Sequence, residues 1–512
     1  MERGRPHGRP RGQKRKRSQP QQRLKICWQY LPLELREMIL EALEDTLQGG
    51  KAASYAAVCR DFYSFFEPYI FKRLQLSVKR IQELGDVIAP RHRSLVQFIR
   101  FRFERSIKPG SMPIIFRTDL DDAAFSYAIF HLFHLLSDWE ERDESQPGIV
   151  LELSAFSVVD PDGSMKDTIP EELRGIDVTV DNDALDAMYD KSAPRSIYYS
   201  KETVKHRHTK LKPFYVSPDF HNMPAVPFPN VQLITDLTVR RQMHSSFFAK
   251  YMGPLVKALP KLEFITYEPC VINILDEHFI RRPDIHISVV ENIIKAMPSS
   301  IRRLQMFEDD DSLYGSCGQT SRWGDRRPLG RLVADLSQDQ EPQAISMSFI
   351  IDAADFFSDF WTAQITRSPD KLGWINLVSL VLTSSLINPS FNQFPPLLLA
   401  AARAARHMPN LEIMEIYNAG SQYGGIFTYI HDKDGSLIHW ESTWNWEFPP
   451  EVIRVWQRAS KVHGKGVFDY SSNRIERRDL KWGGRILSLL RTRATVVHPY
   501  TYGNMMNGLN YM

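Results

Sequence analysis

The sequence contains little cysteine and no long apolar segment. Its four cysteines among 512 residues are widely scattered, and no two of them have the CxxC spacing of a redox or zinc motif. This pattern excludes a disulfide framework and is typical of a reducing compartment. No apolar run approaches the roughly 20 residues that a membrane-spanning helix needs, and the N-terminus lacks the apolar core of a secretory signal. We therefore expect a cytoplasmic and/or nuclear protein with no membrane partner.

Recognisable catalytic motifs are also missing. The chain has no GxxxxGK[ST] phosphate loop, no GxGxxG loop and no GxSxG nucleophile elbow. His131 and His134 lie three residues apart in an apolar segment without a third ligand nearby, so helix packing is the better interpretation. Asp309–Asp311 form a charge run of the kind common in loops, and DKDG at 432–435 lacks the downstream ligand spacing of a calcium loop. We predict a protein that is not an enzyme, with no catalytic residue, metal or cofactor.

Positive charge is confined to the start of the chain. The net charge is +3, but residues 1–25 hold ten Lys and Arg against the single acid Glu2, which gives +9 and leaves 54 basic and 60 acidic residues, or −6, for the rest. An acidic body gives no reason to expect a nucleic-acid partner. Residues 1–25 contain almost no apolar side chain, which predicts a disordered basic tail. Its KRKR run at 14–17 is either a nuclear-import signal or a solubilising cluster.

Two helical patterns follow the tail. The first has apolar residues at four-residue steps, which predict one stripe along a helix: Leu31, Leu35, Ile39 and Leu43. Pro32 suits the first turn, where its missing N–H has no intrahelical partner. The second pattern, in residues 54–71, has apolar residues at three- and four-residue spacings and includes Val58, Cys59 and Phe62.

Past residue 76 helices and strands alternate. Six segments share one plan, in which alternating apolar residues predict a strand and, in most of them, a helix-end signal such as proline comes first: 94–103, 228–239, 259–268, 297–308, 371–384 and 408–420. Prolines at 229, 260 and 298 are 31 and 38 residues apart. Such periods indicate an α/β solenoid with a parallel sheet along one side. A non-repetitive α/β domain is the alternative.

Two long loops and one hairpin complete the predicted organisation. Residues 160–217 and 309–342 are polar, which predicts long loops near these positions. Asp434 and Gly435 predict the turn of a β-hairpin. We predict a helical module at 26–76 and an irregular α/β domain at 77–512.

The first of these regions resembles the F-box, a helical module that docks on a Skp-type adaptor in cullin–RING ubiquitin ligases. The likeness lies in LPLELREMILEAL and AAVCRDFYSFFEPYIFKRL, within residues 28–74. The linker LEDTLQGGKAASYAAV is longer and richer in Gly than is usual in that family. The resemblance implies that the adaptor contacts the following residues: Leu31, Pro32, Leu35, Ile39, Leu43, Val58, Cys59 and Phe62.

The rest of the chain resembles the body of fungal F-box proteins that carry a leucine-rich-repeat-like (LRR-like) C-terminal region of unknown function. The shared phrases are VRRQ at 239–242, YEP at 267–269, FED at 307–309, IDAADFF at 351–357, PNLEIMEIYN at 409–418 and VVHP at 496–499. We therefore predict an α+β chain, in which a small all-α F-box-like module precedes an irregular α/β LRR-like solenoid.

These resemblances imply a substrate-recognition subunit of a Skp–cullin–F-box ligase in the ubiquitin–proteasome pathway. The adaptor would bind residues 28–74, and the strand face or the loops of the solenoid would recognise an unknown target protein. Two alternatives stay open. Leu35, Ile39 and Phe62 could instead pack on the solenoid as an N-terminal cap. The chain could also be a nuclear scaffold that binds nucleic acid or protein through its basic tail.

Overall fold

The computed structural model describes residues 28–44, 52–105, 115–143, 145–157, 227–240, 249–268, 283–308, 327–362, 373–389, 394–420, 423–464, 466–480, 483–499, 501 and 502. The chain divides into two compact units between Glu67 and Pro68, which we name unit 1 and unit 2. The predicted basic tail at 1–25 and the predicted loop at 160–217 lie outside the described residues.

Unit 1 is helical in its described part. It contains η1 (Trp28–Tyr30), α1 (Leu33–Glu44), α2 (Ala52–Ala56) and the first part of α3 (Arg60–Phe71). Helix α1 begins directly after Pro32, and the Pro32 carbonyl accepts its first hydrogen bond, from the Arg36 N–H at 3.1 Å. Proline is suited to a helix start because its φ angle is already close to the helical value.

Unit 2 is built on a sheet whose strand order is the order of the strands in the chain. Its described strands are β1 (Arg73–Leu76), β2 (Phe98–Arg105), β3 (Ile149–Ser157), β4 (Ile234–Val239), β5 (Phe264–Tyr267), β6 (Arg303–Phe307), β7 (Ala344–Asp352), β8 (Ser379–Thr383), β9 (Ile413–Gly420), β10 (Tyr423–His431), β11 (Gly435–Ser442) and β12 (Val467–Arg474). Strand β10 is antiparallel to both of its neighbours, and all other neighbours are parallel.

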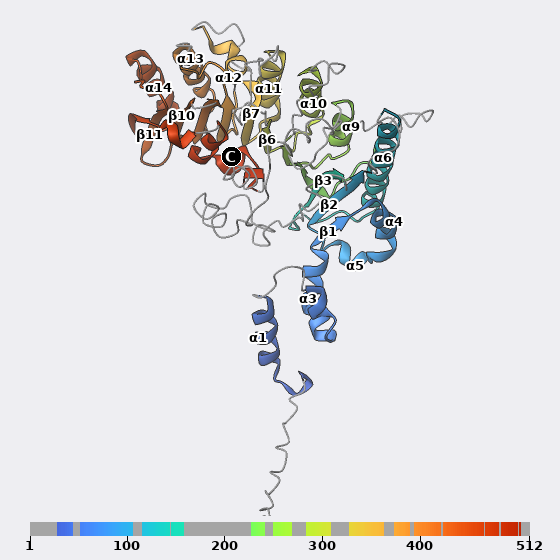
Figure 1. Cartoon of the computed structure of the whole chain (residues 1–512). Coiled ribbons are helices and arrows are strands. Elements are labelled where there is room, and N and C mark those ends of the chain that lie inside the picture. Colours follow the sequence, from blue (N-terminus) through green and yellow to red (C-terminus); the bar gives the residue numbers. More distant parts are fainter. Residues whose placement is uncertain are drawn as a thin grey trace, which may run out of the picture. The chain divides into compact units, whose positions relative to one another are not determined.

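Helices connect the parallel strands. They are α4 (Val78–Val87), α5 (Pro90–Arg93), α6 (Ile115–Ser137), α9 (Ala249–Lys257), α10 (Pro283–Ala296), α11 (Arg327–Gln340), α12 (Ala353–Phe356), η4 (Ser358–Phe360), α13 (Phe394–Ala405) and α14 (Pro450–His463), followed by η6 (Arg477–Leu480), η7 (Gly483–Leu489) and α15 (Arg493–Val496). Crossovers between parallel strands share one hand, so a sheet with sequential strand order collects its helices on one face. Helices α9, α10, α11, α13 and α14 lie along the same side of the strands (Figure 1).

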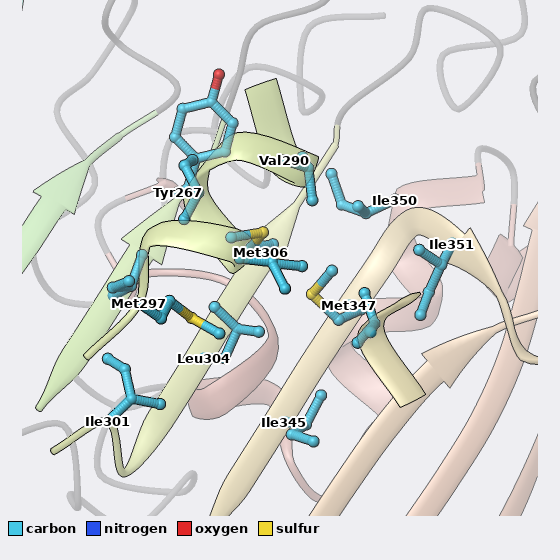
Figure 2. Packing of buried hydrophobic residues seen from close by; sticks show 14 of the residues in the cluster. Tyr267, Val290, Met297, Ile301, Leu304, Met306, Ile345, Met347, Ile350 and Ile351 are labelled. Carbon is cyan, nitrogen blue, oxygen red and sulfur yellow. The ribbon is translucent and has the colours of Figure 1, made fainter. Parts of the chain in front are cut away.

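The main core lies between this helix layer and the sheet. Leu304 and Met306 of β6 are buried beside Ile345 and Met347 of β7, and Val290 of α10 belongs to the same cluster (Figure 2). Successive side chains of a strand point to opposite faces, so the residues between these positions lie on the other face. We call that other side, opposite the helices, the strand face.

The predicted fold class is wrong. The described residues form an α/β fold around a twelve-stranded, mostly parallel sheet, not an α+β chain. A small all-α F-box-like module is not seen at the N-terminus, and the predicted bounds 26–76 differ from those of unit 1, since α3 ends at Phe71 and β1 begins at Arg73. Helical periodicity identifies helices, but it does not show where a compact unit ends.

The local predictions for the body agree better with the structure. Each of the six segments predicted to contain a strand contains one, and these strands pair in parallel with their neighbours apart from the β9–β10 pair. The predicted hairpin is also confirmed, since β10 and β11 pair antiparallel, but its turn lies one residue earlier than predicted, because Gly435 is already the first residue of β11. The predicted loop at 309–342 is wrong in its second half, because residues 327–340 form α11. Leu329 and Val333, four residues apart, anchor that helix in the core although its mean hydropathy is low.

Candidate partner-binding surface in the N-terminal unit

Polar contacts join the first helical turn of unit 1 to α1 and α3. The Trp28 indole Nε1–H donates to Asp61 Oδ2 at 3.0 Å, and Arg36 Nη1 donates to the same oxygen at 2.8 Å. The hydrogen bond from Trp28, followed by that from Arg36, lowers the pKa of the Asp61 carboxyl. One carboxylate therefore orients η1 and α1 relative to α3.

Aromatic rings of η1, α2 and α3 pack against one another beside these polar contacts. Phe62 is buried, with its ring centroid 4.8 Å from that of Trp28 and 6.1 Å from that of Phe66. Phe66 also contacts Tyr55 of α2 at a centroid distance of 5.3 Å. Edge and tilted ring pairs of this kind add to the stability of apolar burial. Unit 1 thus has a small aromatic core of its own.

The exposure of apolar side chains differs around helix α1. Leu40 is 5% exposed and is the one buried residue of the helix. On the outer side, Leu35, Met38 and Ile39 are 46%, 61% and 40% exposed. These three residues have i, i+3 and i+4 spacing, so they are neighbours on one helix face. We call this set the outer α1 face.

The structure separates the eight residues predicted to contact the adaptor into three groups. Pro32, Leu35, Ile39 and Val58 are exposed, Leu31, Leu43 and Cys59 are half-buried, and Phe62 is buried. Phe62 packs inside unit 1 and is a core residue.

Sequence reasoning missed some residues that shape this surface. Met38 lies beside the predicted stripe, three residues after Leu35, but it was not included among the predicted adaptor contacts. Trp28, Arg36 and Asp61 could not be predicted, because apolar periodicity carries no information about a hydrogen-bonded group that joins three segments.

A second candidate lies on the strand face of unit 2. The register of the sheet aligns one residue from each strand in a row that crosses it: Gln75, Arg100, Glu152, Thr238, Thr266, Gln305, Ser346, Val381, Glu415, Thr428, His439 and Ser471. Val381 is the only apolar member of this polar row. Most of the row is buried, although Gln75 and Ser471 at its two ends are exposed. Buried positions of a strand are usually apolar, so a polar row with a buried middle is unusual.

Two charges of the row, Arg100 and Glu152, pair with each other, and Arg240 beside the row joins them. Glu152 Oε1 lies 3.1 Å from Arg100 Nε and accepts a hydrogen bond from Arg240 Nε at 3.0 Å. All three side chains are less than a tenth exposed. Burying ions is costly unless they are paired, so this triad is one interdependent unit.

The C-terminal segment, residues 475–502, covers much of the strand face. Leu480, Ile486 and Val496 share a buried cluster with Phe307 of β6 and Tyr417 of β9. The strand face from β6 to β10 is therefore internal in the described structure. In the described structure, the C-terminal segment occupies that part of the face, which was one of the surfaces expected to recognise a target protein.

Two buried carboxylates hold the C-terminal segment. Glu415 accepts hydrogen bonds from the N–H groups of Arg491 and Thr492, at 3.1 and 3.0 Å. Glu268 accepts from the His498 N–H and from Thr501 Oγ1, both at 2.5 Å. Burial raises the pKa of Glu415, opposed by its hydrogen bonds, and lowers the pKa of His498 well below its usual range. These contacts are structural anchors inside a closed face.

One carboxylate beside the row gives a pH prediction. Burial raises the pKa of Asp236 to about 6, opposed by the hydrogen bond from Thr238 and by the charge of Arg303. The folded state thus binds more protons than the unfolded state between about pH 4 and 6, so Asp236 contributes stability at low pH that is lost as the pH rises through 6. Asp236→Asn should raise the free energy of unfolding at pH 7.5 by about 1 kcal/mol or more, as one pKa unit is ~1.4 kcal/mol.

Urea unfolding of both proteins at pH 4.5 and pH 7.5 measures this effect. The advantage of the variant should shrink at the lower pH, where the wild-type carboxyl is protonated. An equal difference at both pH values would show that Asp236 does not titrate in this range.

The structure gives no geometric support for a metal site in its described part. Among those residues, no three His, Cys, Asp or Glu side chains are grouped as metal ligands. His131 stacks on Tyr127 and His134 packs on Phe130, both within α6. Asp309–Asp311 lie outside the described residues.

Among the described helices, none has both the length and the apolarity to cross a membrane.

Comparison with known proteins assigns no activity to either surface. The sequence profile of the Family of unknown function (DUF6546) matches residues 296–498, which include β6 to β12 and most of the C-terminal segment. No curated protein sequence matches the chain.

Proposed function

We propose that the chain is a substrate-recognition subunit of a Skp–cullin–F-box ubiquitin ligase that works in the cytoplasm, the nucleus or both. The outer α1 face binds the Skp-type adaptor, and unit 2 holds a target protein. The observation that carries this proposal is the exposure of Leu35, Met38 and Ile39 side by side on α1, a helix that buries Leu40 on another side.

Burial of the outer α1 face by a partner protein would be favourable in free energy. Three large apolar side chains in adjacent positions lose solvent contact together when a groove covers them, and each contributes up to about 1.5–3 kcal/mol when fully buried. Amphipathic helices bind grooves through such i, i+3 and i+4 anchors. The hydrogen bonds of Asp61 to Trp28 and Arg36 hold α1 in place before binding, which reduces the ordering entropy that association must overcome.

The sequence resemblance gives the partner its identity. LPLELREMILEAL and AAVCRDFYSFFEPYIFKRL resemble the adaptor-binding segments of F-box proteins, and the exposed residues Pro32, Leu35, Ile39 and Val58 belong to the set that the resemblance assigns to adaptor contact. Adaptor binding requires the outer α1 face, but it does not require a separate helical module.

Co-purification tests the proposal. Full-length protein is expressed with a tagged Skp-type adaptor, and the purified adaptor is analysed by size-exclusion chromatography and mass spectrometry. The chain and the adaptor should elute together at one-to-one stoichiometry, and a cullin should join when it is added. Folded chain that never co-elutes with the adaptor would refute the proposal.

A further inference from the structure

A series of hydrogen bonds links two histidines beside the β10–β11 hairpin. Tyr429 Oη lies 2.5 Å from His463 Nδ1 and 3.3 Å from Ser436 Oγ. Ser436 Oγ in turn lies 2.9 Å from His431 Nδ1. Tyr429 and His431 belong to β10, Ser436 belongs to β11, and His463 is the last residue of α14. We call these four residues the histidine chain, and it connects the hairpin to the end of α14.

A backbone carbonyl fixes the direction of the histidine chain. His463 Nε2 lies 3.0 Å from the carbonyl oxygen of Ala405, the last residue of α13. A carbonyl oxygen only accepts, so Nε2 carries a hydrogen and Nδ1 of the neutral ring is an acceptor. Tyr429 must then donate to His463. The Tyr429 oxygen accepts from Ser436, which accepts from His431 Nδ1–H, so one neutral arrangement of hydrogens satisfies every link.

The middle of the histidine chain is closed to water. Tyr429 is fully buried and Ser436 is 7% exposed, and the Tyr429 ring packs on Trp456 of α14 at a centroid distance of 4.9 Å. Burial raises the pKa of Tyr429 to about 12, opposed by the hydrogen bond with Ser436, so the hydroxyl keeps its proton. A buried hydroxyl that loses its acceptor finds no water to replace it, which is costly.

The two histidines respond differently to acid. His431 is half-buried, and its Nε2 has no hydrogen-bond partner within the described residues. This nitrogen can bind a proton while Nδ1 continues to donate to Ser436. A proton on His463 Nδ1 instead opposes the hydrogen that Tyr429 donates to the same nitrogen. Protonation of His463 therefore requires every hydrogen bond of the chain to reverse.

A charge on both rings breaks the histidine chain. Donors then enter it from both ends, and the two hydroxyl groups between them accept one donor each. Only one of the two hydroxyl hydrogens can be used in the central link, so the other is buried without an acceptor. The two positive rings also repel each other, with centroids 5.8 Å apart.

The surroundings of His463 oppose its charged form. Burial lowers the pKa of His463 and the charge of His431 lowers it further, against the hydrogen bonds to the Ala405 and Met408 carbonyls. The other charged or histidine residues of α13, α14 and strands β9 to β11, with the turns beside them, are exposed or make contacts elsewhere: Arg403, Arg406, His407, Glu412, Glu415, Asp432, Lys433, Asp434, His439, Glu441, Glu451, Arg454, Arg458 and Lys461.

We propose that the histidine chain is an acid-sensitive latch, which holds the end of α14 against α13 and the β10–β11 hairpin at neutral pH and releases it in acid. A ring that binds its proton only in the open state favours that state as the pH falls below about 6.5, the usual pKa of histidine. The latch thus contributes stability above that pH and loses it below. Strand β12 begins at Val467, four residues after His463, so release also loosens the last strand. The latch does not depend on adaptor binding by unit 1.

Hydrogen–deuterium exchange of the full-length protein tests the latch. Mass spectrometry follows peptides from residues 450–474 at pH 7.5 and pH 5.5, with rates corrected for intrinsic exchange. The opening equilibrium of this region should rise about tenfold at the lower pH, because a ring with a pKa near 6.5 that protonates only in the open state gains that factor. Peptides from α11 identify any general loss of fold.

Three variants separate the latch from simple burial of a histidine. His463→Gln carries no titrating ring, so its opening should change less than twofold between the two pH values. In His431→Asn the amide replaces Nδ1 and can also accept from Ser436, so the chain can reverse around a charged His463 and the rise should shrink. The matched control His439→Gln alters a β11 histidine that contacts Ser471 outside the chain, so it should keep the tenfold rise.

Three outcomes would overturn the latch. They are a wild type without the rise in acid, a full rise in His463→Gln, and a rise in His431→Asn equal to that of wild type. The last result would show that His463 responds through burial alone. If His463→Gln also exchanges rapidly in α11, His431→Asn decides the question, since it keeps the hydrogen bond to Ser436.

Discussion

Simultaneous replacement of Leu35 and Ile39 by alanine should abolish stable retention of a Skp-type adaptor. Two central apolar anchors of an interface contribute about 2–4 kcal/mol together, which weakens binding roughly thirty- to a thousandfold. The fold should be unaffected, because both side chains are 40% or more exposed and their truncation leaves no core cavity. Isothermal calorimetry with purified adaptor measures the affinity, and thermal unfolding verifies the fold.

Two control variants make this result specific. Ile375→Ala truncates an apolar side chain in unit 2 that is 55% exposed, so it should leave adaptor affinity unchanged. Leu40→Ala truncates the buried side of α1 and should destabilise unit 1, since buried Leu→Ala changes cost about 2–5 kcal/mol. If Leu35→Ala/Ile39→Ala binds the adaptor as tightly as Ile375→Ala does, the outer α1 face is not the docking surface.

Glu152→Gln should be among the most destabilising conservative substitutions in unit 2. Glu152 pairs with Arg100 and Arg240, and all three side chains are less than a tenth exposed. Glutamine keeps the size of the side chain but removes its charge, so two buried guanidinium groups lose their shared anion. Removal of one partner from a buried ion cluster typically costs about 3–5 kcal/mol.

Urea unfolding at pH 7.5 measures this cost, with Glu291→Gln as the matched control. Glu291 pairs with Lys295 across one helical turn of α10, and both side chains are exposed. Exposed pairs of this kind contribute only about 0.3–0.5 kcal/mol. A similar small effect of both substitutions would mean that the Glu152 cluster is solvated in solution.

Much of the local structure could be predicted from the sequence. Six strand segments between residues 94 and 420, the helix after Pro32 and the β10–β11 hairpin all lie where their patterns place them. These features depend on interactions between residues close in the chain, which alternation of apolar residues, proline and glycine report directly. The α11 helix was missed because its exposed polar residues obscured two core positions, Leu329 and Val333.

The sequence by itself determined that the chain is rich in alternating helices and strands and that an apolar helix follows the basic tail. Only the tertiary structure decided that a single sheet makes the fold α/β, that Leu35 and Ile39 are exposed while Leu40 is buried, and that the C-terminal segment covers part of the strand face. Glu415 and Thr492 hydrogen-bond across 77 residues of sequence. The physical reason is that such contacts depend on strand order and register, which no local spacing encodes.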